Sequence, residues 1–101
     1  MSIRLNAEWM TAADERLLEE LAGEGWTHPR RLAASPAVYL SYRETRLRLR
    51  FLADAELVAP SDDDFDLYHI TGDGERYLQG ERDQELHPHP FTYGRATTRL
   101  M

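Results

Sequence analysis

Cysteine is absent from this 101-residue chain, which excludes disulfide bonds, thiolate catalysis and cysteine-based zinc sites. The sequence also lacks any run of about 18 apolar residues, so it contains no candidate transmembrane helix. No long apolar stretch follows the single basic residue near the start, Arg4, so we expect no secretory signal. These absences together predict a cytoplasmic protein that does not enter a membrane.

Lysine is the second missing residue type, since all twelve basic residues are arginine. Eighteen aspartates and glutamates outnumber them and give a formal net charge of −6. Lysine is normally common, so its absence points either to a GC-rich genome or to an acidic, salt-adapted cytoplasm. The acidic excess favours the second cause, and we interpret the protein as halophilic. A negative net charge argues against nucleic-acid binding unless arginines gather locally.

Three helices are predicted in the first half of the chain. The first has Thr11 as its N-cap and ends at Gly23 or Gly25. The second covers about residues 29–34 and has a proline in its first turn. The third is the longest, at about residues 42–55.

The third helix begins at a capping box, in which Ser41 is the cap and Glu44 reaches back to it. Its apolar face is predicted to consist of Tyr42, Thr45, Leu49 and Leu52. Its opposite face is predicted to carry Arg43, Arg46, Leu47, Arg50 and Asp54. Arg48 lies between the two faces, where we expect it to pair with Glu44 or Asp54 or to contact phosphate.

A β-hairpin follows, with strands at 57–59 and 65–70 around the loop 60–64. A last helix starts after its N-cap Thr71, and its aromatic residue Tyr77 faces inward. Three helices, a hairpin and a helix give a mainly α fold with a small β-hairpin, the plan of a winged helix-turn-helix.

The chain divides into three parts on this interpretation. Residues 1–10 form an N-terminal arm, 11–82 the winged helix-turn-helix domain and 83–101 a polar C-terminal tail. The arginine-rich third helix is the natural recognition helix, because a guanidinium group can contact guanine O6 and N7 together or bind phosphate. The candidate DNA-binding residues are Arg43, Arg46, Leu47, Arg50 and Arg48.

Four stretches of the chain carry a family resemblance. They are Trp9-Met10-Thr11 with Asp14 and Leu17-Leu18-Glu19, Tyr42-Arg43-Glu44 with Arg46 and Arg48-Leu49-Arg50, Leu52-Ala53-Asp54 with Leu57-Val58, and Tyr68-His69-Ile70-Thr71 with Gly74, Tyr77-Leu78 and Gly80-Glu81. In these stretches the chain resembles small haloarchaeal winged-helix regulators of the halophage-repressor type, a group often placed loosely with MarR-like regulators. The resemblance implies a transcriptional regulator that binds double-stranded DNA as a homodimer.

Two positions depart from the family pattern. The hairpin loop carries Asp62, Asp63 and Asp64, whose carboxylates DNA phosphates would repel. Glu56 stands where such proteins often have a glycine that closes the recognition helix. The acidic loop supports an alternative function, in which the winged helix is a protein–protein interaction module that does not bind DNA.

Other functional classes find little support in the sequence. No catalytic triad or phosphate-binding glycine loop is present, so we expect neither an enzyme nor a cofactor. His87 and His89 are too few ligands to predict a metal site. The residues Trp9, Trp26 and Tyr39 either pack in or at the rim of the core or form a dimer interface.

Overall fold

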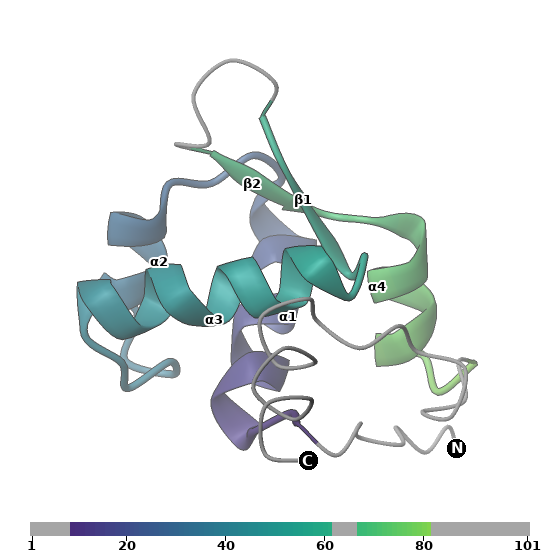
Figure 1. Ribbon diagram of the computed structural model, residues 1–101, viewed down its shortest axis with the longest axis horizontal. Coiled ribbons are helices and arrows are strands. Elements are labelled where there is room, and N and C mark those ends of the chain that lie inside the picture. Colours follow the sequence, from purple (N-terminus) through teal and green to yellow (C-terminus); the bar gives the residue numbers. More distant parts are fainter. Residues whose placement is uncertain (1–8, 62–66, 82–101) are drawn as a thin grey trace, which may run out of the picture.

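The computed structural model describes residues 9–61 and 67–81. The elements run in the order α1 (Ala12–Glu24), α2 (Pro29–Ala34), α3 (Tyr42–Asp54), β1 (Val58–Pro60), β2 (Tyr68–Ile70) and α4 (Gly72–Leu78). In Figure 1, α3 crosses in front of α1 and the hairpin lies above α3. Helix α4 lies at the right, near the end of the hairpin that is away from its loop. The predicted fold class, a mainly α winged helix-turn-helix with one antiparallel hairpin, is confirmed.

The helices begin where the sequence predicted, because polar side chains bind the unpaired N–H groups of each first turn. His28 Nδ1 accepts from the backbone N of Arg30 at 3.0 Å, and Thr71 Oγ1 accepts from the backbone N of Gly74 at 3.0 Å. Helix α1 ends at Gly25, whose φ of 81° lies in the left-handed region that glycine adopts without strain.

The core lies where α1, α3 and the hairpin meet. Its fully buried side chains include Leu17, Leu18, Leu21, Leu32, Leu49, Leu52, Leu57 and Tyr77. Full burial of one such aliphatic side chain contributes about 1.5–3 kcal/mol to folding. Trp9 is also buried and packs edge-on against Phe51, so it belongs to this core. Trp26 and Tyr39 are exposed.

The described part of the hairpin differs from the prediction in its register and has an additional backbone partner. Val58 pairs with Ile70 and Pro60 pairs with Tyr68, so the first strand lies one residue later than expected. Of the predicted second strand, residues 68–70 are strand and Leu67 is not, while 65–66 lie outside the described residues. The link between α1 and α2 adds a bridge, in which Thr27 and Tyr68 exchange backbone hydrogen bonds of 2.8 and 2.9 Å. This bridge ties the loop end of the described hairpin strands to the helical part of the fold.

The backbone conformation at the end of α3 explains why similar proteins often have a glycine where this chain has Glu56. Glu56 has a φ of 68°, a left-handed conformation that costs a residue with a Cβ about 1–2 kcal/mol. Just beyond it, the backbone N of Leu57 donates to the oxygen of Leu52 at 2.9 Å and turns the chain into β1. A glycine would adopt this turn without strain.

Among residues 9–61 and 67–81, no helix is both long enough and apolar enough to cross a bilayer.

A substitution at Gly74 tests how closely α4 packs against the hairpin. A Cβ at this position would lie 2.2 Å from the carbonyl oxygen of Leu57 and 2.6 Å from Ile70 Cγ1. We expect Gly74→Ala to lower the free energy of unfolding by about 1–3 kcal/mol in urea denaturation, because the strand must shift to admit the methyl group. The control Gly23→Ala meets nothing within 4 Å inside α1 and should stabilise the protein. Equal effects of the two substitutions would contradict this packing.

Candidate nucleic-acid interface

Helix α3 begins at the predicted capping box. The backbone N of Ser41 donates to Glu44 Oε1 at 3.0 Å, and the Ser41 hydroxyl accepts from the backbone N of Glu44 at 3.0 Å. The hydrogen bonds from the Ser41 backbone and side chain lower the pKa of the Glu44 carboxyl. The only acidic side chain in the first turn of α3 is therefore engaged at the helix end.

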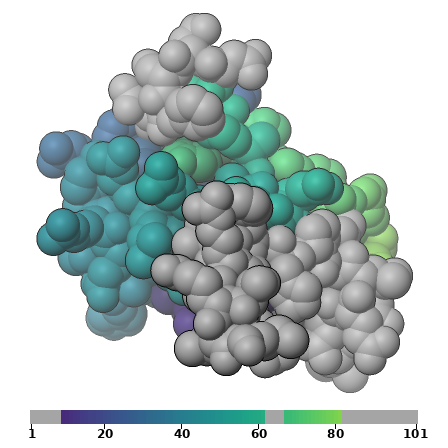
Figure 2. Space-filling view, in the orientation of Figure 1, coloured from purple at the N-terminus to yellow at the C-terminus, as the bar shows by residue number. Residues whose placement is uncertain are grey.

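The two faces of α3 follow the predicted pattern, except that Tyr42, which was predicted for the apolar face, is only half-buried. Thr45, Leu49 and Leu52 are fully buried against the core. The opposite face is exposed and carries Arg43, Arg46, Leu47 and Arg50. Positions separated by three or four residues share a helix face, so the side chains of these residues project from one side of α3. In Figure 2 the blue and teal side chains of α2 and α3 protrude at the left of the molecule.

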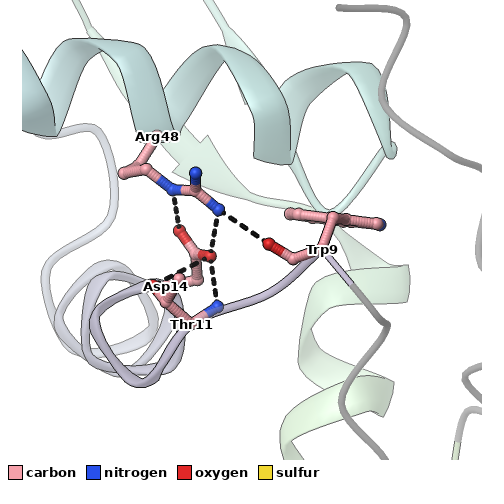
Figure 3. Close-up of polar contacts among 4 residues, drawn as sticks. All are labelled: Trp9, Thr11, Asp14 and Arg48. Atoms are coloured by element: carbon pink, nitrogen blue, oxygen red, sulfur yellow. Dashed lines mark hydrogen bonds and ion pairs between the residues drawn. The ribbon is translucent and has the colours of Figure 1, made fainter. Parts of the chain in front are cut away.

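Arg48 is the exception among the arginines of α3, because it points inward. Its Nε and Nη2 donate to Asp14 Oδ1 and Oδ2 at 2.9 and 2.6 Å, and Nη2 also donates to the carbonyl oxygen of Trp9 at 3.0 Å (Figure 3). The prediction that Arg48 pairs with Glu44 or Asp54 was wrong, because its partner lies on α1 and is 34 residues away in the sequence.

Asp14 is fully buried, so its charge requires compensation from the protein itself. Besides the two bonds from Arg48, its Oδ2 accepts from the backbone N of Thr11 at 2.8 Å and from the Thr11 hydroxyl at 3.2 Å. The structure shows that the carboxylate also joins the start of α1 to the middle of α3.

The described arginines fall into two groups. Four form ion pairs with carboxylates: Arg16 with Glu19, Arg31 with Glu24, Arg48 with Asp14 and Arg76 with Asp73. The other four show no carboxylate partner within the described ranges: Arg30, Arg43, Arg46 and Arg50. All four of the second group are exposed and lie on α2 or α3. Uncompensated positive charge is thus confined, in this part of the chain, to the α2–α3 side.

Comparison with solved structures gives one strong match. The fold superposes on the crystal structure of the PhiH1 repressor-like protein from Haloarcula marismortui with a TM-score of 0.79 and 34% sequence identity. The match covers 88% of this chain and 99% of that one. The chain belongs to the PhiH1 repressor-like family. No protein-family model and no curated protein matches the chain.

Membership of the PhiH1 repressor-like family confirms the haloarchaeal, repressor-like part of the sequence resemblance. The looser grouping with MarR-like regulators stays a prediction. The Tyr-x-Ile-Thr-x-x-Gly stretch that carried part of the resemblance has a structural basis in this fold. Tyr68 anchors the hairpin through its bridge to Thr27, Thr71 caps α4, and Gly74 permits the close approach of α4 to the chain before β1.

Helix α2 adds a residue to the candidate interface that sequence reasoning missed. The guanidinium carbon of Arg30 lies 4.5 Å from the centre of the Tyr42 ring, and that of Arg46 lies 5.7 Å from the same centre. The helix order alone could not identify this contact, since it depends on how α2 packs against α3. The available signal was a pair of adjacent arginines, Arg30-Arg31, in the first half of the helix that precedes the recognition helix.

The Tyr68 hydroxyl, at the loop end of the hairpin, interacts electrostatically with two of the same arginines. Burial raises the pKa of the Tyr68 hydroxyl, and the positive charges of Arg50 and Arg46 act on it in the opposite direction. Leu47 stands beside them and exposes 47% of its surface.

Several predicted features lie outside the described residues. They are most of the N-terminal arm, the acidic loop with Asp62, Asp63 and Asp64, and the tail with His87 and His89. Within the described ranges, no three histidine or acidic side chains come together in a way that could hold a metal ion.

Arg48 and Arg50 are a matched pair for separating a structural from a surface role. We expect Arg48→Ala to lower the free energy of unfolding by about 3–5 kcal/mol, because it leaves the Asp14 charge buried and unpaired. Arg50→Ala removes an exposed side chain from the same helix and should change the free energy of unfolding by less than about 0.5 kcal/mol. Denaturation in urea measures both values, and a similar small loss for the two variants would show that the Asp14–Arg48 pair does not hold α1 to α3.

Proposed function

We propose that this chain is a DNA-binding transcriptional regulator of the repressor type and that it has no enzymatic activity. Helix α3 enters the major groove, whose width admits an α-helix. The observation that carries the proposal is that the four described arginines without a carboxylate partner all lie exposed on α2 or α3, whereas the other four described arginines form ion pairs. The solved relative supports it, since that protein is itself described as repressor-like.

The unpaired arginines supply what DNA requires of a partner. Phosphates demand positive charge, and guanine presents O6 and N7 to a forked guanidinium group. We assign Arg43, Arg46 and Arg50 to base edges or phosphates, and Leu47 to apolar contact with a thymine methyl group. Arg48 is left out of the assignment, because its Nε and Nη2 are already bonded inside the protein.

The salt-adapted composition shapes how such a surface can bind DNA. At about 1 M salt the Debye length is near 3 Å, so a broad positive field is screened and counterion release contributes little. Direct contacts between guanidinium groups and base edges act at short range, so salt weakens their contribution to binding less than it weakens a broad positive field. An overall charge of −6, with four described arginines on α2 and α3 that have no carboxylate partner in the described ranges, is consistent with recognition at short range.

A homodimer completes the proposal. Two copies related by a two-fold axis place their α3 helices about 34 Å apart, one turn of DNA, so the bound sequence is an inverted repeat. The alternative function is a winged-helix module that binds proteins and excludes DNA. It rests on the acidic loop, and it predicts no selection of any DNA sequence.

Selection of bound duplexes from a random DNA pool in about 1 M KCl tests the proposed function. We expect the wild-type protein to enrich a short inverted repeat, and Arg46→Ala and Arg50→Ala to lose it, because a bidentate base contact discriminates by about 1–3 kcal/mol. Arg16→Ala is the control, since Arg16 pairs with Glu19 on α1 and should retain the enriched sequence. Absence of enrichment by the wild-type protein would contradict DNA recognition. Equal enrichment by all variants would remove these arginines from the interface.

A further inference from the structure

The adjacent arginines of α2 have opposite surroundings. Arg31 turns toward α1 and pairs with Glu24 at 2.9 Å, so its charge is compensated. Arg30 has no carboxylate partner among the described residues, and its guanidinium carbon lies 4.5 Å from the centre of the Tyr42 ring on α3. The same ring holds Arg46 of α3 at 5.7 Å. One aromatic side chain therefore gathers two uncompensated arginines from two different helices.

We infer that Arg30 is a further DNA-contacting residue, which binds a backbone phosphate, and that Tyr42 is the positioning residue that sets Arg30 beside Arg46. The inference rests on the proposed function, because it extends the α3 interface across the junction with α2. Neither Arg30 nor Tyr42 is among the candidate DNA-binding residues that the sequence identifies.

The geometry of the contact favours this role. A guanidinium group attracted to a ring face keeps its N–H donors in its own plane, where they remain available to an anion. Tyr42 is the first residue of α3 and half-buried, so its ring has a fixed position relative to the recognition helix. The His28 ring, with its plane only 7° from that of Tyr42 and its centre 6.4 Å away, adds a second contact from the start of α2.

The position of Arg30 points to phosphate and not to a base. Helix α3 supplies the side chains that enter the groove, whereas in helix-turn-helix domains the helix before it crosses the DNA backbone. A phosphate contact orients the protein on the duplex without reading sequence. Arg30 would thus fix the angle at which α3 lies, while Arg46 beside it reaches into the groove.

The salt dependence of binding tests the assignment of Arg30. The probe is a fluorescein-labelled, mixed-sequence duplex of about two helical turns, titrated between about 50 and 200 mM KCl. We expect Arg30→Ala and Arg30→Gln to weaken binding and to make the slope of log K against log [KCl] shallower by about 0.9, the loss of one phosphate contact. The matched control Arg31→Ala should keep the wild-type slope, because its charge is already paired with Glu24.

Substitution of Tyr42 tests the positioning role. Tyr42→Leu should weaken binding about two- to fivefold, the size of one exposed cation–π contact, whereas Tyr42→Phe retains the ring face and should bind as the wild type does. In the Arg30→Ala background, Tyr42→Leu should weaken DNA binding by a smaller factor than it does in the wild type, because one of the two positioned arginines is already gone. Thermal midpoints measured for each variant verify that the fold is intact.

The outcomes separate the two proposals. If the wild-type protein binds the duplex and Arg30→Ala has the same slope as Arg31→Ala, the assignment of Arg30 is overturned while the proposed function stands. Failure of Tyr42→Phe to restore the binding lost in Tyr42→Leu overturns the positioning role of the ring. No binding by the wild-type protein at any KCl concentration overturns the proposed function and this inference with it.

Discussion

The buried contact between Asp14 and Arg48 is the interaction on which the remaining structure depends. It joins the first turn of α1 to the middle of α3 through two hydrogen bonds, and Arg48 extends it to the backbone of Trp9. A buried ion pair contributes little net stability compared with apolar packing, but it strongly penalises arrangements in which either charge loses its partner. The pair therefore fixes how α3 is rotated about its own axis against α1.

That rotation determines which side chains of α3 remain available to a ligand. With Arg48 turned inward, the 3.6-residue period of the helix directs Arg43, Arg46 and Arg50 outward together. Four other arginines of the described chain form ion pairs with carboxylates, as Arg31 does with Glu24. A protein with an acidic excess can in this way keep a local positive surface, because four of its described arginines are paired with carboxylates and the arginines of that surface are not.

The sequence predicted the fold and both faces of α3, because these depend on signals local in the chain. The capping box at Ser41 and the spacing of Leu49 and Leu52 carry that information within a few residues. The partner of Arg48 and the contact between Arg30 and Tyr42 were beyond such reasoning. Both join residues of different helices, and their geometry exists only once the helices have packed. The pattern placed Arg48 between the faces, but it could not show that a buried carboxylate lay opposite.

The central claim is that the outward arginines of α3 contact base edges in the major groove. Methylation of guanine N7 blocks that edge, so methylation interference on a duplex enriched by the protein measures the claim most directly. The proposal predicts that methylated guanines at specific positions in each half of the duplex prevent binding, and that Arg46→Ala or Arg50→Ala removes the interference at individual positions. Interference that is absent, or identical in the wild type and both variants, would contradict major-groove reading by α3.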